Sequence, residues 1–287
     1  MAHRMEESPP KVSRILFTNT TIANPTGTEL YVRDLAKEFA ARGCEVVIYT
    51  PRPGRLAEDI RAMAIPVVSQ LAHLGSPPDI IHGQHHVPTM QALLAFPGTP
   101  AVLFCHGWRP WEEMPPAFPR IRRHVAVDPV TRDRIVHESG VALDKVRLIP
   151  NFVDLEVFRP RWPLPEWPER AAIFSNYVKP GSPYFRAVAA ACSHLGIPLD
   201  VVGAGFGTET NRPESVLPNY DLVFAQGRSA IEALAVGAAV IVASSRAFGP
   251  LVRPENFAEL RRCNFGIRAL AYPVDAAHIE SEIRKFE

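Results

Sequence analysis

Short apolar runs alternate with segments of helical periodicity along the chain. In the first half, apolar runs that predict buried strands lie at 14–19, 45–51, 65–71, 78–83, 101–107, 124–128 and 146–154, and helical patterns lie at 28–42, 87–96 and 129–140. Gly43 is predicted to close the first helix, because glycine readily adopts the conformation that ends one. This alternation is typical of a parallel, doubly wound α/β sheet.

A second alternating set follows a proline-rich break. The segment 159–169 (RPRWPLPEWPE) holds four prolines and two tryptophans. After it, strands are predicted at 171–176, 199–205, 220–226 and 239–244, and helices at 183–196, 229–237, 255–263 and 276–286. We therefore predict two Rossmann-like domains, residues 1–158 and 170–287, joined by a linker at 159–169. Two such sheets are expected to face a cleft, because ligands bind beyond the carboxyl ends of parallel strands.

Composition narrows the classes of protein. The 287 residues are 47% hydrophobic and carry a formal net charge of +1, which argues against disorder and against a nucleic-acid partner. The four cysteines are far apart and form no CxxC, so reduced thiols are expected. There is no apolar run long enough to cross a membrane and no hydrophobic leader near the first residue. We therefore expect a cytoplasmic protein.

The stretch LVFAQGRSAIEALAVG places Gly227, Arg228 and Ser229 between an apolar run and a helical pattern. A helix N-terminus there would attract an anion, and arginine can donate two hydrogen bonds to a phosphate. The alternative is a capping box, with Ser229 as N-cap and Glu232 bonding back. Lys179 precedes a further helix start and could neutralise a phosphate.

For the helix predicted at 183–196, Ser182 is the expected N-cap and Pro183 the first helical residue. In the first half, Thr26 and Glu29 of TGTE also have capping-box spacing, and Gly27 there would let a diphosphate or sugar approach the backbone. We include Gly27 and Thr28 among the donor-binding candidates.

Two glycines and one histidine complete the candidate residues. Gly203 and Gly205 of VVGAGFG are followed by no helical pattern, so the segment does not fit a dinucleotide fingerprint. We expect these glycines to line a sharp turn near a ligand. His106 ends the strand AVLFCHG, at an edge where a side chain can meet a substrate.

No metal site is expected. His82, His85 and His86 in HGQHH leave zinc as an alternative, but no carboxylate or cysteine nearby completes a ligand set. The chain has no Asp-x-Asp, the paired carboxylates that commonly hold a nucleotide diphosphate through a divalent metal. Lysine, arginine and helix N-termini would then balance the phosphate charge.

Several stretches together resemble the retaining family-four glycosyltransferases of the GT-B fold, also called group 1. These are NPTGTELYVRDLAKEFAARGCEVVIYTP, DIIHGQHH, VRLIPNFVDLEVFRP and EALAVGAAVIVAS, in the family's order. The resemblance implies transfer of a sugar from a nucleoside-diphosphate donor to a sugar, lipid or small-molecule acceptor, usually without a metal or other cofactor. The donor would lie mostly on the second half and the acceptor mostly on the first.

The resemblance also implies roles for single residues. Glu232 would contact the donor ribose and Lys179 the diphosphate, while Gly27 would lie near the phosphate and sugar. His106 would sit by the reacting centre, so we list His106 and Glu232 as catalytic candidates. The phosphate would help to deprotonate the acceptor, and the barrier would fall through positioning and charge stabilisation.

The second half departs from the family pattern. Phe224 occupies the place of the first of two family glutamates, Ser175 replaces the arginine that partners the lysine, and QGRS shortens the donor loop. We hypothesise that Arg228 compensates as a phosphate ligand. Two alternatives stay open: a catalytically degenerate nucleotide-sugar-binding protein, and a sugar-nucleotide epimerase or hydrolase on the same scaffold. For the aromatic loop 108–118, the alternatives are a plain packed loop, an acceptor wall and a peripheral membrane contact, and the plain packed loop is favoured.

Overall fold

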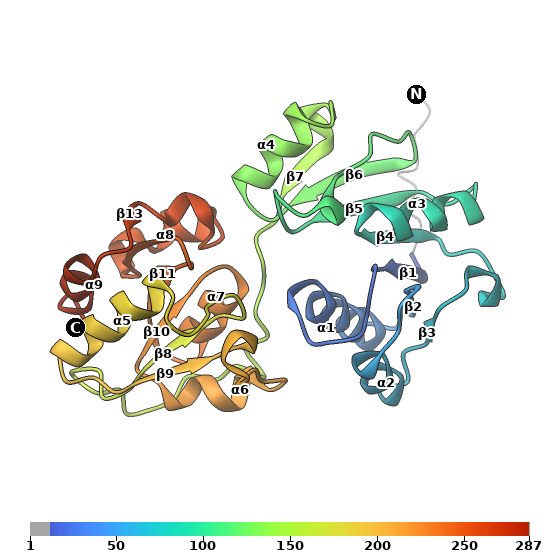
Figure 1. Cartoon of the computed structure of the whole chain (residues 1–287). Coiled ribbons are helices and arrows are strands. Elements are labelled where there is room, and N and C mark those ends of the chain that lie inside the picture. The colour runs from blue at the N-terminus through green and yellow to red at the C-terminus, as the bar shows by residue number, and fades with distance from the viewer. Residues whose placement is uncertain (1–11, 287) are drawn as a thin grey trace, which may run out of the picture. The chain divides into compact units, whose positions relative to one another are not determined.

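A computed structural model describes residues 12–286 and separates them into two compact units (Figure 1). Unit 1 runs to Val127 and includes Thr131–Leu148. Unit 2 contains Asp128–Val130 and the chain from Ile149.

Unit 1 is built on a sheet of seven strands in the order β3-β2-β1-β4-β5-β6-β7, and every pairing in it is parallel. The strands are β1 (Arg14–Thr18), β2 (Glu45–Tyr49), β3 (Val67–Val68), β4 (Ile80–Gln84), β5 (Ala101–Cys105), β6 (Ile121–Ala126) and β7 (Val146–Leu148). The helices are α1 (Gly27–Ala41), α2 (Arg55–Ala62), α3 (His86–Ala95) and α4 (Pro129–His137).

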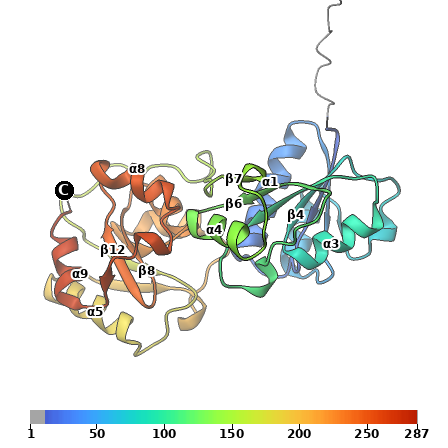
Figure 2. The ribbon, with the colours of Figure 1, turned by 90° about the horizontal axis from the view of Figure 1, so that it is seen from above.

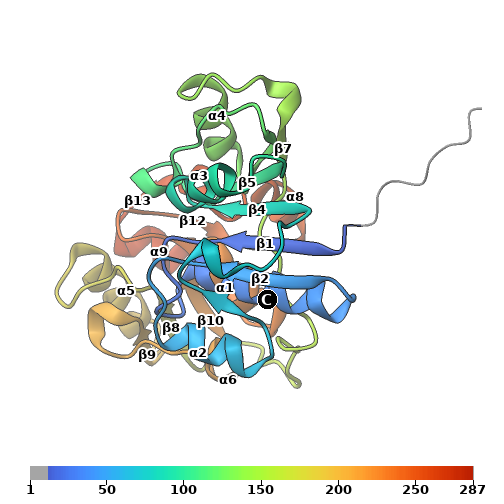
Figure 3. The same ribbon diagram turned by 90° about the vertical axis from the view of Figure 1, so that its right-hand side faces the viewer.

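Helices cover both faces of this sheet (Figure 3). On one face, Val32 of α1 and Ile60 of α2 pack with Phe17 of β1. On the other face, Leu93 of α3 and Ile135 of α4 pack in one buried cluster with strand side chains that point to that face. Because both faces are buried, the strands are continuous apolar runs, which is why the hydrophobic pattern predicts them well.

Unit 2 contains a sheet of six strands in the order β13-β12-β11-β10-β8-β9. The strands are β8 (Ala171–Phe174), β9 (Leu199–Val202), β10 (Leu222–Ala225), β11 (Ala239–Ala243), β12 (Ala247–Leu251) and β13 (Tyr272–Pro273). The helices are α5 (Pro183–His194), α6 (Pro213–Val216), α7 (Arg228–Ala235), α8 (Pro254–Arg262) and α9 (Ala276–Ile283). The first four strands are parallel, and β12 and β13 run antiparallel to their neighbours.

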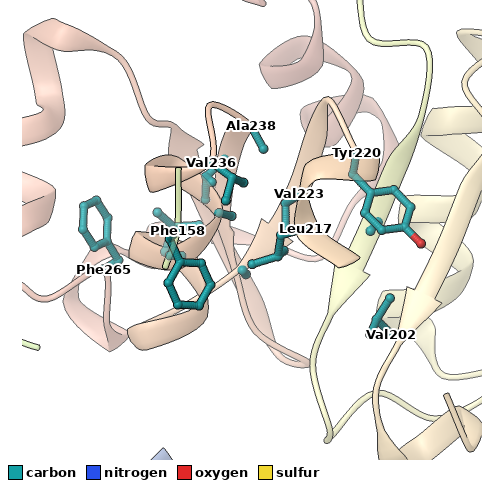
Figure 4. Close-up of a cluster of buried hydrophobic side chains, with 14 of the residues drawn as sticks. Phe158, Val202, Leu217, Tyr220, Val223, Val236, Ala238 and Phe265 are labelled. Atoms are coloured by element: carbon teal, nitrogen blue, oxygen red, sulfur yellow. The ribbon is translucent and has the colours of Figure 1, made fainter. Parts of the chain in front are cut away.

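The two faces of this second sheet bury different clusters. Helices α5 and α9 lie side by side on one face (Figure 2) and pack Val188 and Ile279 against Phe224. On the other face, α7 and α8 cover the cluster in Figure 4, where Val223 of β10 lies beside Leu217 and Val236. The prediction of two doubly wound, Rossmann-like halves is confirmed, with an antiparallel addition at the β12 edge.

The proline-rich segment packs on unit 2. Phe158 is buried in the cluster of Figure 4. Arg161 donates to the Tyr220 carbonyl at 3.0 Å and to the Asp221 carboxylate at 2.5 Å. The proline-rich segment belongs to unit 2, which includes the chain from Ile149, and Phe158 and Arg161 connect it to that unit.

Several local features differ from the expectations. The run 65–71 forms only the two-residue strand β3, because the chain turns into a short 3₁₀ helix at Leu71. Helix α2 was not predicted, and neither was β12, whose pairing with β11 depends on a tertiary register. Gly43, with φ of +83°, follows α1 as predicted.

Candidate functional site

His106 follows β5 at the carboxyl edge of the unit 1 sheet. Its Nε2 lies 2.5 Å from Oε1 of Gln84, the last residue of the neighbouring strand β4. The Tyr31 ring of α1 meets the imidazole edge-on, with the centroids 4.5 Å apart. The structure therefore fixes the ring of the predicted catalytic histidine from two sides.

Gln84 connects His106 to a second, buried histidine. Because residues two apart in a strand share a face, His82 lies on the same side of β4 as Gln84, and its Nδ1 is 3.2 Å from Gln84 Nε2. The His82 ring lies between Phe17 and Phe104, with centroids 4.4 and 4.3 Å away. Burial, the largest cause, lowers the pKa of His82 to about 3, so this imidazole is neutral near pH 7.

Glu113 holds the backbone of His106. This carboxylate ends the short 3₁₀ helix Trp111–Glu113 and is 5% exposed. It accepts the His106 amide N–H at 2.9 Å, and His85 Nε2 lies 3.5 Å from it. Burial alone would raise the pKa of Glu113, but the His85 hydrogen bond and the two nearby histidines hold that pKa below its usual value. Gln84 and Glu113 were missed in the sequence, because no pattern connects either to His106.

The start of α1 is only partly the predicted capping box. Thr26 is the N-cap, but its side chain makes no capping hydrogen bond to the backbone, and its hydroxyl donates to the Glu29 carboxylate. Thr28 donates to the same carboxylate at 3.0 Å. Gly27 is exposed, and a methyl group added there would meet nothing within 4 Å. The backbone at Gly27 is thus accessible, whereas the Thr28 hydroxyl is engaged by Glu29.

In unit 2, α7 begins at the carboxyl end of β10 in a different way from the predicted capping box. The N-cap is Gly227, with φ of +59°, and there is no side-chain capping bond. Ser229 is the second helical residue, so its predicted N-cap role is wrong. The reason is that the glycine turns the chain into the helix two residues earlier. Gln226 is exposed and Gly227 half-buried, and a methyl group on Gly227 would meet open space.

Arg228 and Glu232 form an ion pair within α7. Arg228 Nε lies 2.6 Å from Glu232 Oε1, and the two side chains are 13% and 5% exposed. The structure brings these two predicted residues together, but it directs them to each other. Their roles as phosphate and ribose ligands stay predictions.

The loop after β8 carries Lys179, the second of the two cations predicted to bind phosphate. Its side chain is exposed. Three residues later, Ser182 accepts the Phe185 N–H at 3.3 Å and Pro183 opens α5, which confirms the predicted cap. The Ser182 cap therefore satisfies part of the α5 N-terminus, whereas α7 begins without a side-chain cap.

Gly203 and Gly205 bring the loop after β9 against the loop after β8. A Cβ on Gly203 would lie 2.0 Å from the Ser175 carbonyl oxygen, and one on Gly205 would lie 1.9 Å from the Val178 carbonyl oxygen. Only glycine permits this approach. The sharp turn is present as the 3₁₀ helix Ala204–Phe206, and the predicted contact with a ligand stays a prediction.

Comparison with known proteins finds a family model and solved structures that resemble the chain. The family model described as Glycosyltransferase Family 4 matches residues 25–157. A glycosyltransferase from Rickettsia africae is 15% identical with a TM-score of 0.58, over 80% of this chain and 79% of that one. HepE of Anabaena, solved in complex with UDP and glucose, is 14% identical with a TM-score of 0.55, over 95% and 98%. The chain has the GT-B fold of these glycosyltransferases, and its first half resembles Glycosyltransferase Family 4.

A third similar structure is that of the calicheamicin glycosyltransferase CalG4, which is 15% identical with a TM-score of 0.51, over 96% of this chain and 90% of that one. No curated protein matched the sequence. The family match lies mainly in unit 1, and the low identities to the solved structures establish the fold alone.

The three histidines of HGQHH do not converge on one point. Each histidine of HGQHH has a different partner: His82 contacts Gln84, His85 lies against Glu113, and His86 Nδ1 is 3.0 Å from the Glu112 carbonyl oxygen. Within residues 12–286, no group of three or more histidines, cysteines or carboxylates could hold a metal ion. In the same part of the chain, no helix combines the length and hydrophobicity needed to cross a bilayer.

A cavity of about 540 Å³ lies elsewhere in unit 2. It runs along the edge strand β9 and is lined also by Phe185, Phe206, Thr208 and Tyr220. None of the predicted donor-binding residues lines it. The cavity is therefore separate from the α7 N-terminus and from the loop that carries Lys179.

Proposed function

We propose that this protein moves a sugar from a nucleoside-diphosphate sugar to an acceptor hydroxyl, with retention of configuration and without a metal. The observation that carries the proposal is the start of α7. This eight-residue helix begins at the carboxyl end of β10 without a side-chain cap. Its N-cap Gly227 is half-buried and donates its N–H to the Phe265 carbonyl oxygen at 3.0 Å, but the space beside its Cα is open. Backbone N–H groups and the helix dipole favour an anion at such a point.

We assign the donor diphosphate to this edge of unit 2, with Lys179 as its cation and Ser229 as a hydroxyl donor at the second helical position. Gly203 and Gly205 shape the loop beside Lys179 and need no direct contact with the donor. HepE, which resembles this chain over nearly its whole length and was solved with UDP and glucose, supports uridine as the first nucleotide to test.

On unit 1, we assign His106 to the transferred sugar or the acceptor hydroxyl. Its ring and its backbone are held by separate buried groups, Gln84 and Glu113. Such preorganisation lowers the barrier by positioning, and the leaving diphosphate, stabilised by Lys179 and α7, receives the developing charge. No protein nucleophile is required in this scheme.

One observation favours a second candidate, a protein that binds nucleotide sugars without turning them over. Glu232, which the family resemblance assigns to the donor ribose, is 3% exposed and pairs with Arg228. Unless that pair opens, this carboxylate does not reach a ribose.

Turnover of a donor panel separates these functions. The full chain is incubated in EDTA with UDP-, GDP-, ADP- and dTDP-sugars, and release of the nucleoside diphosphate is measured. We expect release with one donor class, and a decrease of roughly 100-fold for His106→Ala, the scale of loss expected when a group that positions the reacting sugar is removed. His73→Ala, on an exposed histidine, is the matched control.

Binding without release would support the non-catalytic candidate, and an epimerised sugar would support the epimerase. Equal release by His106→Ala and by His73→Ala would contradict the role of His106.

A further inference from the structure

The contact between His106 and Gln84 belongs to a buried chain of hydrogen bonds. Gln84 is 0% exposed, and its side-chain amide lies between His82 Nδ1 at 3.2 Å and His106 Nε2 at 2.5 Å. Its backbone is held as well, because Thr18 Oγ1 accepts the Gln84 N–H at 3.2 Å and donates to the Gln84 carbonyl oxygen. The Gln84 amide therefore spans the two imidazoles from a fixed backbone.

The chain has a direction. His82 is neutral, since burial lowers its pKa to about 3, so one of its ring nitrogens is an acceptor. The Gln84 side chain turns Nε2 toward Nδ1 of His82 and Oε1 toward Nε2 of His106. Because an amide oxygen can only accept, this arrangement requires a proton on Nε2 of His106.

We propose that Gln84 is a positioning residue that holds His106 in the Nε2–H tautomer, so that Nδ1 is the acceptor that the neutral ring offers to a sugar hydroxyl. The role of Nδ1 toward a sugar hydroxyl rests on the proposed function of His106. The tautomer does not depend on that function. It also explains why a polar amide occupies an aromatic interior. A leucine or methionine would fill the same volume without the desolvation of two polar groups.

Other charged groups near His106 do not define the tautomer. Glu113 accepts the His106 amide N–H, and Arg134 donates to the Gly107 carbonyl at 3.3 Å. Tyr31 packs edge-on against the imidazole. Electrostatic interactions connect the ring to Glu113 and His82, and the hydrogen bond at Nε2 is the one with Gln84.

Nitrogen NMR of the ligand-free full chain, with ¹⁵N-labelled histidine, tests the tautomer. At pH 7.5 we expect the His106 Nε2 to be protonated and its Nδ1 unprotonated. Gln84→Met removes the acceptor, so both tautomers should become populated. Gln84→Glu places a carboxylate at Nε2 and should raise the pKa of His106 by about one unit or more. Gln91→Met, on an exposed glutamine of α3, is the control.

A proton on Nδ1 in the wild-type protein, or an unchanged tautomer in Gln84→Met, would overturn the proposal. If Gln84→Met does not fold, the pKa change in Gln84→Glu decides, and an unchanged His106 pKa there is the contradicting result. Because these measurements need no substrate, a protein with the expected tautomer and no turnover would refute the proposed function alone.

The kinetic consequence separates positioning from a merely structural role. In Gln84→Met we expect kcat to fall by roughly 10-fold to 100-fold while KM for the donor is unchanged, as for residues that orient a functional group. The double variant Gln84→Met/His106→Ala should be no slower than His106→Ala. An independent, additive loss in the double variant would show that Gln84 does not act through His106.

Discussion

Gly205→Ala is expected to destabilise unit 2 by about 3 kcal/mol or more, a loss at the upper end of the usual range for overpacking. The new Cβ would lie 1.9 Å from the Val178 carbonyl oxygen, which is backbone and cannot rotate away. The two loops after β8 and β9 would have to separate. Thermal and urea unfolding of the full chain measure the effect.

Gly207→Ala is the matched control, two residues further along the same turn. A methyl group there meets nothing within 4 Å, but φ is +68°, so only the cost of a left-handed residue, roughly 1–2 kcal/mol, is expected. If Gly205→Ala were no less stable than Gly207→Ala, the close approach of the two loops would be wrong. Because Lys179 lies just after Val178, Gly205→Ala should also weaken donor binding.

Arg228→Ala is expected to lower the free energy of unfolding by about 3 kcal/mol, the usual result of removing one partner from a buried ion pair. Arg228 Nε is 2.6 Å from the Glu232 carboxylate, whose side chain is only 5% exposed. After the substitution that carboxylate stays buried with its charge poorly compensated. Chemical denaturation gives the difference in free energy directly.

An ion pair of the same spacing supplies the control. Arg284 and Glu280 of α9 also lie four residues apart, 2.6 Å from each other, but the arginine is 58% exposed. Arg284→Ala should therefore cost well under 1 kcal/mol. The double variant Arg228→Met/Glu232→Leu should recover most of the stability that Arg228→Ala loses. Similar losses for the two arginines would show that the α7 pair is solvated and open to a ligand.

The fold could be predicted because its strands are buried on both faces and its helices are bounded by local signals. Gly43 and the Ser182–Pro183 pair act within a few residues of their own helix, so the sequence alone is sufficient for them. The α7 start shows the limit of such signals. SAIE has capping-box spacing, but the positive φ of Gly227 starts the helix before Ser229.

The site was predicted less completely, because its contacts join distant segments. His106 was found from its place at the end of a strand. Gln84 reaches it only because β4 and β5 are paired with Gln84 opposite Phe104, and Glu113 reaches it from a loop without periodicity. The predicted role of Glu232 as a ribose ligand did not take into account its buried ion pair with Arg228. No sequence pattern shows that these two side chains turn toward each other.

The central claim is that unit 2 holds the diphosphate of a nucleotide sugar with helix N–H groups and Lys179, without a divalent cation. Calorimetric titration of the full chain with UDP, GDP and ADP in EDTA tests it most directly. We predict that one of these nucleotides binds in EDTA. Its affinity should fall about tenfold in Lys179→Ala. The affinity should be unchanged in the control variant Lys145→Ala, which alters an exposed lysine of unit 1. Absence of binding for all three, or binding that appears only when Mg²⁺ or Mn²⁺ is added, would contradict it.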